Sequence, residues 1–132
     1  HKFFRLGFHC RFIEDSHMQA MSASLLKQGD VALAISNSGS TKEVIEALRQ
    51  ARQAGATTIC ITSHHNAPIT KVSDIRLVTK SPENLYRGEP MENRFAQLYM
   101  LDLLFVSVAI RRRELFISNL EKTRKALTGK KL

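Results

Sequence analysis

Four hydroxyl side chains lie within six consecutive positions, directly after the short apolar run Val31–Ile35. These residues are Ser36, Ser38, Ser40 and Thr41. Asn37 and Gly39 complete the segment, and a glycine allows the backbone to approach a ligand closely. Several neutral hydrogen-bond donors that converge on one group suit a phosphate, and no lysine is required. The segment therefore predicts an anion-binding loop.

The same residues permit a simpler interpretation. Ser40 and Glu43 have the spacing of a capping box, in which the two side chains satisfy the free backbone groups at a helix start. Four hydroxyls in six residues exceed what a cap uses, which favours the ligand. Both interpretations stay open at the level of sequence.

The elements around this loop follow the pattern of a parallel sheet with crossover helices, because apolar runs alternate with amphipathic segments. Strands are predicted over residues 9–13, 31–35, 57–62 and 75–79. Helices are predicted over residues 16–27, 41–54, 68–72, 93–110 and 114–127. Prolines and a glycine within residues 80–92 predict a surface loop. We expect an α/β fold, a three-layer α/β/α sandwich with a mainly parallel sheet and a helical C-terminal extension.

This arrangement gives the hydroxyl loop a defined place. Residues 36–41 join a buried strand to a helix, so they lie at the carboxyl edge of the sheet, where open α/β sheets bind ligands. The helix that starts near Thr41 adds free N–H groups and the positive end of its dipole.

Composition narrows the function classes. The chain has 132 residues and a formal charge of +8, but residues 111–132 alone hold eight Lys or Arg and two Glu. That basic tail could contact DNA, form a solvated helix face or meet an acidic partner; without interleaved aromatic residues or a DNA-reading motif, the last two are favoured.

Cys10 and Cys60 lie in apolar runs, so we expect two buried small side chains, compatible with a reducing cytoplasm. The apolar residues 95–110 fall short of the roughly 20 needed to cross a bilayer, and no membrane partner is expected.

Residues 36–43 (SNSGSTKE) resemble the SxSGxTxE loop of sugar isomerase (SIS) domains. Residues 94–105 (RFAQLYMLDLLF) resemble the RxAQLxxxDxLF segment of RpiR-type bacterial transcriptional regulators. The resemblance implies one flavodoxin-like SIS domain over residues 1–132, with phosphate held by Ser36, Ser38 and Thr41 and by N–H groups from Asn37 to Ser40. It also implies a first strand with a glycine- and serine-rich loop ahead of His1, which we expect the printed sequence to omit or another chain to supply.

For function, the resemblance implies a cytoplasmic domain that senses a phosphorylated sugar without a cofactor. DNA would be bound by a helix-turn-helix domain outside this sequence. A homodimer or homotetramer is expected, built by the apolar helix at residues 93–110. A scaffold with a degenerate site is a further alternative.

An enzyme is the main alternative, an aldose–ketose isomerase with Glu92 as its base. Glu92 falls where catalytic SIS isomerases keep a glutamate, and it could instead bind a ligand hydroxyl or sit solvated at a helix start. Arg94 and Phe95 occupy the positions of the Lys and His of amidotransferase-type isomerases, and Phe95 cannot transfer a proton. No catalytic residue is therefore assigned beyond this weak candidate.

The histidines complete the candidate set. His17 lies at a predicted helix start near the ligand edge and is expected to contribute to ligand binding, in SIS oligomers sometimes to the site of a neighbouring subunit. His64 and His65 follow a strand at that edge and are expected on a solvated rim. No third ligand accompanies them, so no metal is predicted.

Overall fold

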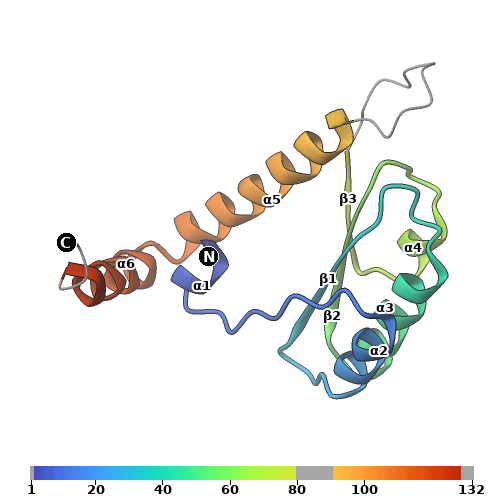
Figure 1. The fold of residues 1–132 in the computed structure, drawn as a ribbon, viewed down its shortest axis with the longest axis horizontal. Coiled ribbons are helices and arrows are strands. Elements are labelled where there is room, and N and C mark those ends of the chain that lie inside the picture. The colour runs from blue at the N-terminus through green and yellow to red at the C-terminus, as the bar shows by residue number, and fades with distance from the viewer. Residues whose placement is uncertain (1, 80–90, 129–132) are drawn as a thin grey trace. The chain divides into compact units, whose positions relative to one another are not determined.

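The computed structural model describes residues 2–79 and 91–128, with the side chains of Met91 and Glu92 excepted. These residues form two compact units, one of Ile13–Met100 and one of His1–Phe12 with Leu101–Leu132. The ribbon in Figure 1 labels the elements of both units. Each unit is considered by itself below.

The first unit contains a three-stranded parallel sheet in the order β1-β2-β3. The strands are β1 (Val31–Ile35), β2 (Thr57–Thr62) and β3 (Ile75–Val78). In the register of the sheet, Ile61 of β2 pairs with Ile35 of β1 and with Leu77 of β3. The predicted parallel sheet is confirmed, and its first two strands have the predicted bounds.

Three helices cover one face of the sheet, and the last two of them in chain order also connect its strands (Figure 1). They are α2 (Ser16–Ser24), α3 (Lys42–Gln53) and α4 (Pro68–Lys71). The side chains of Leu48 and Ile69 pack with Cys60, which is fully buried, while Ala51 packs with Ala23 where α3 meets α2. Burial of this apolar surface is the main stabilising term for the layer.

The strand predicted over residues 9–13 is wrong. These residues carry no strand assignment, and the Phe12 side chain is 86% exposed. Cys10 is also exposed, which corrects its predicted burial, whereas Cys60 is buried as predicted. An apolar run becomes a strand only beside a partner that accepts its backbone hydrogen bonds, and none of the described strands pairs with this run.

Helix α2 is shorter than predicted and is fixed at its start. The Asp15 carboxylate accepts a hydrogen bond from the Met18 N–H at 2.9 Å, as an N-cap residue does. The Gln19 amide donates to the carbonyl of Ile13 at 3.0 Å, which ties the preceding chain to the helix. The helix ends at Ser24 rather than at residue 27.

The second unit is helical and contains α1 (Lys2–Arg5), α6 (Arg113–Thr128) and the end of α5 (Met91–Arg111). Phe105 lies at its centre, with its ring edge-to-face against Phe3 at 6.1 Å and against Phe116 at 5.7 Å between centroids. The helices predicted over residues 93–110 and 114–127 are confirmed. The predicted loop over residues 80–92 lies almost wholly outside the described residues.

Helix α5 extends beyond the apolar run seen in the sequence. Its segment Asn93–Arg111 has 19 residues, a mean hydropathy of 1.2 and 11% of its residues buried, so by length and composition it could cross a membrane. The helix is therefore longer than the apolar run of residues 95–110. Asp102 lies near the middle of that segment and forms an ion pair with Lys2 at 2.6 Å, and a charge at that depth in a bilayer is costly. These contacts of Asp102 and Phe105 favour a helix that packs against protein.

Candidate functional site

The loop after β1 continues the sheet before it turns. The Ser36 N–H donates to the Ile61 carbonyl at 3.0 Å, so the pairing of β1 with β2 extends past Ile35. The Ser36 side chain is 8% exposed, and its hydroxyl accepts a hydrogen bond from the Gly39 N–H at 3.1 Å. It lies 3.3 Å from the Thr41 hydroxyl. Ser36 therefore forms the inner wall of a closed turn whose other hydroxyls are exposed.

Gly39 is required by the packing under the turn. Its φ is +63°, and a Cβ at this position would lie 2.4 Å from the Ala67 Cβ and 2.8 Å from the Thr62 Oγ1. The Gly39 carbonyl also accepts a hydrogen bond from the Ile69 N–H at 3.0 Å. Only glycine fits both the left-handed backbone and this close approach, so the loop is held in one conformation.

The start of α3 lacks the capping box that the sequence permits. The N-cap residue is Thr41, whose side chain makes no cap hydrogen bond, and Glu43 is the second helical residue rather than the third. The Ser40 hydroxyl instead donates to the Ser38 carbonyl at 3.3 Å. The first-turn N–H groups of α3 are therefore not covered by the N-cap side chain. They remain available to an anion at the positive end of the helix dipole.

Asn37 is anchored from the end of β2. Its carbonyl accepts hydrogen bonds from the Thr62 hydroxyl at 3.1 Å and from the Ser63 N–H at 3.0 Å. Its side-chain oxygen accepts a third from the Ser63 hydroxyl. Sequence reasoning missed Thr62, the last residue of β2, and Ser63, which follows that strand.

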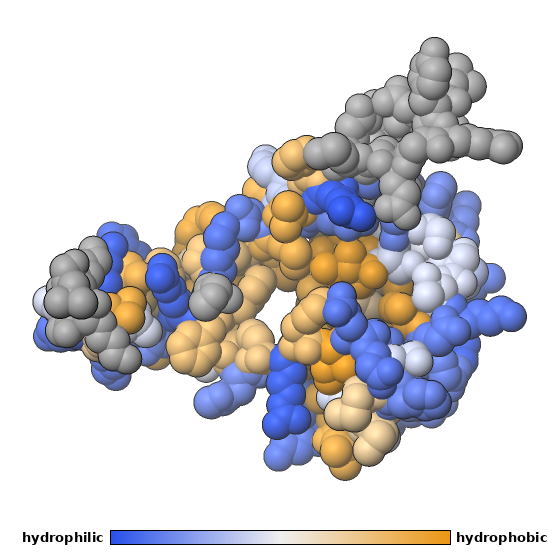
Figure 2. Space-filling view, viewed as in Figure 1, coloured by the Kyte–Doolittle hydropathy of each residue, from blue (hydrophilic) through white to orange (hydrophobic). Residues whose placement is uncertain are grey.

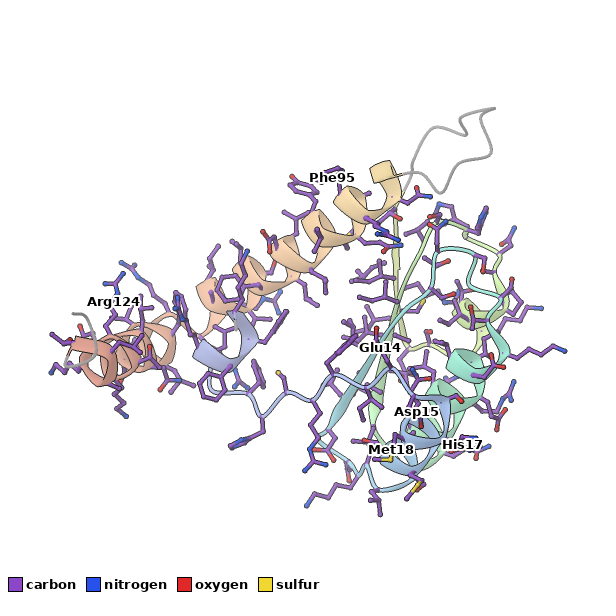
Figure 3. All side chains as sticks on the ribbon, viewed as in Figure 1. Glu14, Asp15, His17, Met18, Phe95 and Arg124 are labelled. Atoms are coloured by element: carbon purple, nitrogen blue, oxygen red, sulfur yellow. The ribbon has the colours of Figure 1, made fainter. Side chains whose placement is uncertain are left out.

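His17 and the loop meet in one groove. His17 is exposed in the first turn of α2 (Figure 3), and it lines a groove of about 760 Å³ together with Ser40, Lys42 and Glu43. Ser40 is the residue of the hydroxyl loop that shares this groove with His17, and a contribution of His17 to ligand binding stays a prediction. Charges of both signs line the groove, and Glu46 and Arg49 on α3 pair with each other.

The remaining candidates have different positions. Glu92 lies in the first turn of α5, and its side chain is outside the described residues. Phe95 follows it with 64% of its side chain exposed, and Figure 3 shows it projecting from the helix. His64 and His65 are exposed after β2. Within residues 2–79 and 91–128, no group of three or more His, Cys, Asp or Glu side chains is arranged to hold a metal ion.

A second polar network lies at the amino ends of β2 and β3. The Asp74 carboxylate accepts hydrogen bonds from the Thr58 N–H at 2.9 Å and from the Thr58 hydroxyl at 2.8 Å, and Arg52 lies 3.1 Å away. The backbone N–H of Thr58, then its hydroxyl, and also the Arg52 guanidinium hold the pKa of Asp74 below its ordinary value of 3.8. All of these partners belong to the protein itself.

A parallel sheet whose strand ends carry a hydroxyl-rich loop and a helix start without a side-chain cap is typical of the open α/β domains that bind ligands at this edge. The SIS domain family model matches residues 1–107, and the chain belongs to this family.

The curated relatives are transcriptional regulators. The chain is 42% identical to the HTH-type transcriptional regulator RpiR of Escherichia coli K12 over 123 residues, which are 93% of this chain and 42% of that protein. It is 42% identical to an HTH-type transcriptional regulator of Caldanaerobacter subterraneus over 131 residues, 99% of this chain and 46% of that protein. The chain therefore spans less than half the length of these relatives.

The solved structures agree with the fold. The Vibrio vulnificus NanR protein complexed with ManNAc-6P has a TM-score of 0.87 and 30% identity, covering 98% of this chain and 49% of that one. The sugar isomerase domain of an RpiR transcription factor from Sphaerobacter thermophilus has a TM-score of 0.77 and 19% identity, covering 95% and 68%. The second likeness shows the shared fold alone.

Proposed function

We propose that this chain is the sugar-phosphate-sensing module of an RpiR-type transcriptional regulator. The observation that carries the proposal is the uncapped start of α3 behind the exposed hydroxyls of Ser38, Ser40 and Thr41. A phosphate seated there accepts hydrogen bonds from these hydroxyls and from the first-turn N–H groups, and the helix dipole favours its charge. The NanR structure with ManNAc-6P supports a phosphosugar as the ligand class.

The titration of a double variant tests this role. Ser36→Ala with Ser38→Ala removes one hydroxyl that closes the turn and one that faces the ligand. Loss of the Ser38 hydrogen bond to a charged group lowers affinity by roughly 10-fold or more, and loss of the Ser36 hydroxyl that closes the turn adds to this effect. Calorimetry with a panel of sugar phosphates measures the loss, and thermal unfolding confirms that the variant folds. Unchanged affinity for a member that binds the wild type would remove the loop from the site.

DNA binding belongs, in this proposal, to a helix-turn-helix domain outside the printed sequence, and the protein acts in the cytoplasm. Support comes from the relatives, which are HTH-type transcriptional regulators. The basic α6 is then a solvated or interface helix. An operator-binding assay of the whole protein, with and without a sugar phosphate, measures the coupling between the two sites.

The isomerase alternative receives no support from α5. Phe95 occupies the position at which the resemblance to amidotransferase-type isomerases requires a histidine, and an exposed phenyl ring moves no proton. A coupled aldose–ketose assay with the same sugar-phosphate panel checks this conclusion. Turnover that is lost in Glu92→Gln would reverse it.

A second copy of the chain is the proposed partner of α5. Exposed apolar side chains recur every three or four residues along this helix, where they gather in Figure 2. They are Phe95, Leu98, Tyr99, Leu103, Val106 and Ile110. An apolar stripe of this kind marks a protein interface. Light scattering should find a homo-oligomer for the wild type and a monomer for Leu98→Lys; an unchanged mass would exclude the helix from the interface.

A further inference from the structure

Both oxygen atoms of Asn37 are occupied by residues from the end of β2. The backbone carbonyl receives the Thr62 hydroxyl and the Ser63 N–H, and the side-chain oxygen receives the Ser63 hydroxyl. Thr62 is fully buried, so this anchor belongs to the rigid part of the sheet. The position and the orientation of Asn37 are therefore set by two residues that lie 25 and 26 positions later in the chain.

This arrangement fixes what Asn37 can offer to a ligand. A side-chain amide has one acceptor oxygen and one NH₂ group with two donors. With the oxygen turned to Ser63, the NH₂ group is the end left to face outward, and the Asn37 side chain is exposed. Its sequence neighbours Ser36 and Ser38 belong to the hydroxyl loop, so Asn37 is part of the same turn as the candidate anion site.

We propose that Ser63 is a positioning residue for ligand binding, which holds the Asn37 amide so that its NH₂ group donates to a phosphate oxygen. The inference rests on the proposed phosphate-binding function. A hydroxyl can both donate and accept a hydrogen bond, whereas the NH₂ group of a fixed amide only donates. The site is thereby selective for acceptor groups on the ligand at this position.

The Ser63 hydroxyl contributes little to folding in this account, because its partner is an exposed side chain at the protein surface. Without this hydrogen bond, the Asn37 amide is free to rotate. Ligand binding must then fix the amide, and the side-chain entropy that is lost lowers the affinity. The expected effect of Ser63→Ala is a loss of affinity of roughly 3- to 10-fold, the range for one uncharged hydrogen bond.

NMR titration of the protein with inorganic phosphate provides the test. In the wild type, the side-chain NH₂ signals of Asn37 should shift on binding; in Ser63→Ala that shift should shrink and the dissociation constant should rise. Ser63→Thr keeps the hydroxyl and should restore both. Ser24→Ala is the matched control, because it also deletes a serine hydroxyl, one that donates to the Met21 carbonyl at 2.7 Å in a helix outside the hydroxyl loop.

A double-variant cycle separates positioning from a general structural effect. Ser63→Ala should have no further effect on affinity in an Asn37→Ala background, because its target is gone. Wild-type affinity in Ser63→Ala, or an equal loss in both backgrounds, would overturn the inference. A wild-type protein that binds neither inorganic phosphate nor any sugar phosphate would instead contradict the proposed function itself.

Discussion

The two ends of the three-stranded sheet carry similar polar residues in opposite states. At the amino ends, the Asp74 carboxylate accepts two hydrogen bonds from Thr58 and pairs with Arg52, so its partners are residues of the same chain. At the carboxyl ends, the exposed hydroxyls of Ser38 and Thr41 surround a helix start that the N-cap side chain leaves open. A closed network contributes to stability, whereas an open set of donors is available to a ligand.

The contrast leads to four predictions, ordered by their expected effect on stability. A substitution at Gly39, where the loop packs closely on the residues beneath it, should alter both ligand binding and folding. Changes in the closed network should alter folding alone. Changes to the exposed hydroxyls should alter binding alone.

Gly39→Ala should have the largest effect. The new Cβ meets Ala67 and Thr62 at a backbone of φ +63°, so we expect a loss of about 3 kcal/mol in unfolding free energy. Gly29→Ala is the matched control, because Gly29 has φ +94° with nothing within 4 Å of the added Cβ. That variant should lose about 1 kcal/mol from backbone strain and keep wild-type phosphate affinity. Urea unfolding and calorimetry measure both; equal losses in the two variants would deny the close packing beneath the loop.

Asp74→Asn should lower the melting temperature by less than Gly39→Ala and leave phosphate affinity unchanged. The variant keeps the shape of the side chain but removes its charge beside Arg52, which lies 3.1 Å away. Asp102→Asn removes an exposed carboxylate from a surface ion pair and should change stability less. Thermal unfolding of the three proteins gives the order. A loss of phosphate affinity in Asp74→Asn would link the two ends of the sheet and break the contrast.

The pH dependence of Asp74 follows from its lowered pKa. A carboxyl whose pKa is lower in the folded state stabilises the fold fully above its unfolded value of 3.8, and this contribution disappears as the pH falls through the folded value. The difference in unfolding free energy between wild type and Asp74→Asn should therefore be constant from pH 7 to about pH 5. It should shrink below the ordinary value of 3.8. Denaturant unfolding at several pH values checks this, and a difference that grows on acidification would contradict it.

Thr41→Val should have the smallest effect on stability and a clear effect on binding. The Thr41 side chain makes no cap hydrogen bond, so the usual cost of losing an N-cap does not apply, and stability should change by less than about 0.5 kcal/mol. Phosphate affinity should fall by roughly 10-fold or more, because one hydrogen bond to a charged group is lost. A large loss of stability with unchanged phosphate affinity would instead show that Thr41 serves to cap the helix.

Much of the fold could be predicted because the signals are local. The runs Val31–Ile35 and Thr57–Thr62 are continuous and apolar or β-branched, and their bounds agree with the structure. The hydroxyl loop was visible for the same reason, since six neighbouring residues form it. The strand predicted over residues 9–13 failed because a strand also depends on a partner, and local sequence does not report one.

The parts of the site that could not be predicted depend on distant residues. Thr62 and Ser63 reach Asn37 only through the register of β1 with β2, which spacing along the chain does not give. The choice between capping box and binding loop likewise depended on the residue at which α3 begins. Helix ends are uncertain by one or two residues from sequence, and here one residue changes the N-cap from Ser40 to Thr41.

The central claim is that the open loop binds a phosphate group on a sugar. Calorimetric titration of the protein with pairs of phosphorylated and unphosphorylated sugars tests it most directly. We expect saturable binding of at least one sugar phosphate, with no heat from the matching unphosphorylated sugar. Equal binding of both members of a pair, or no binding of any sugar phosphate, would contradict it.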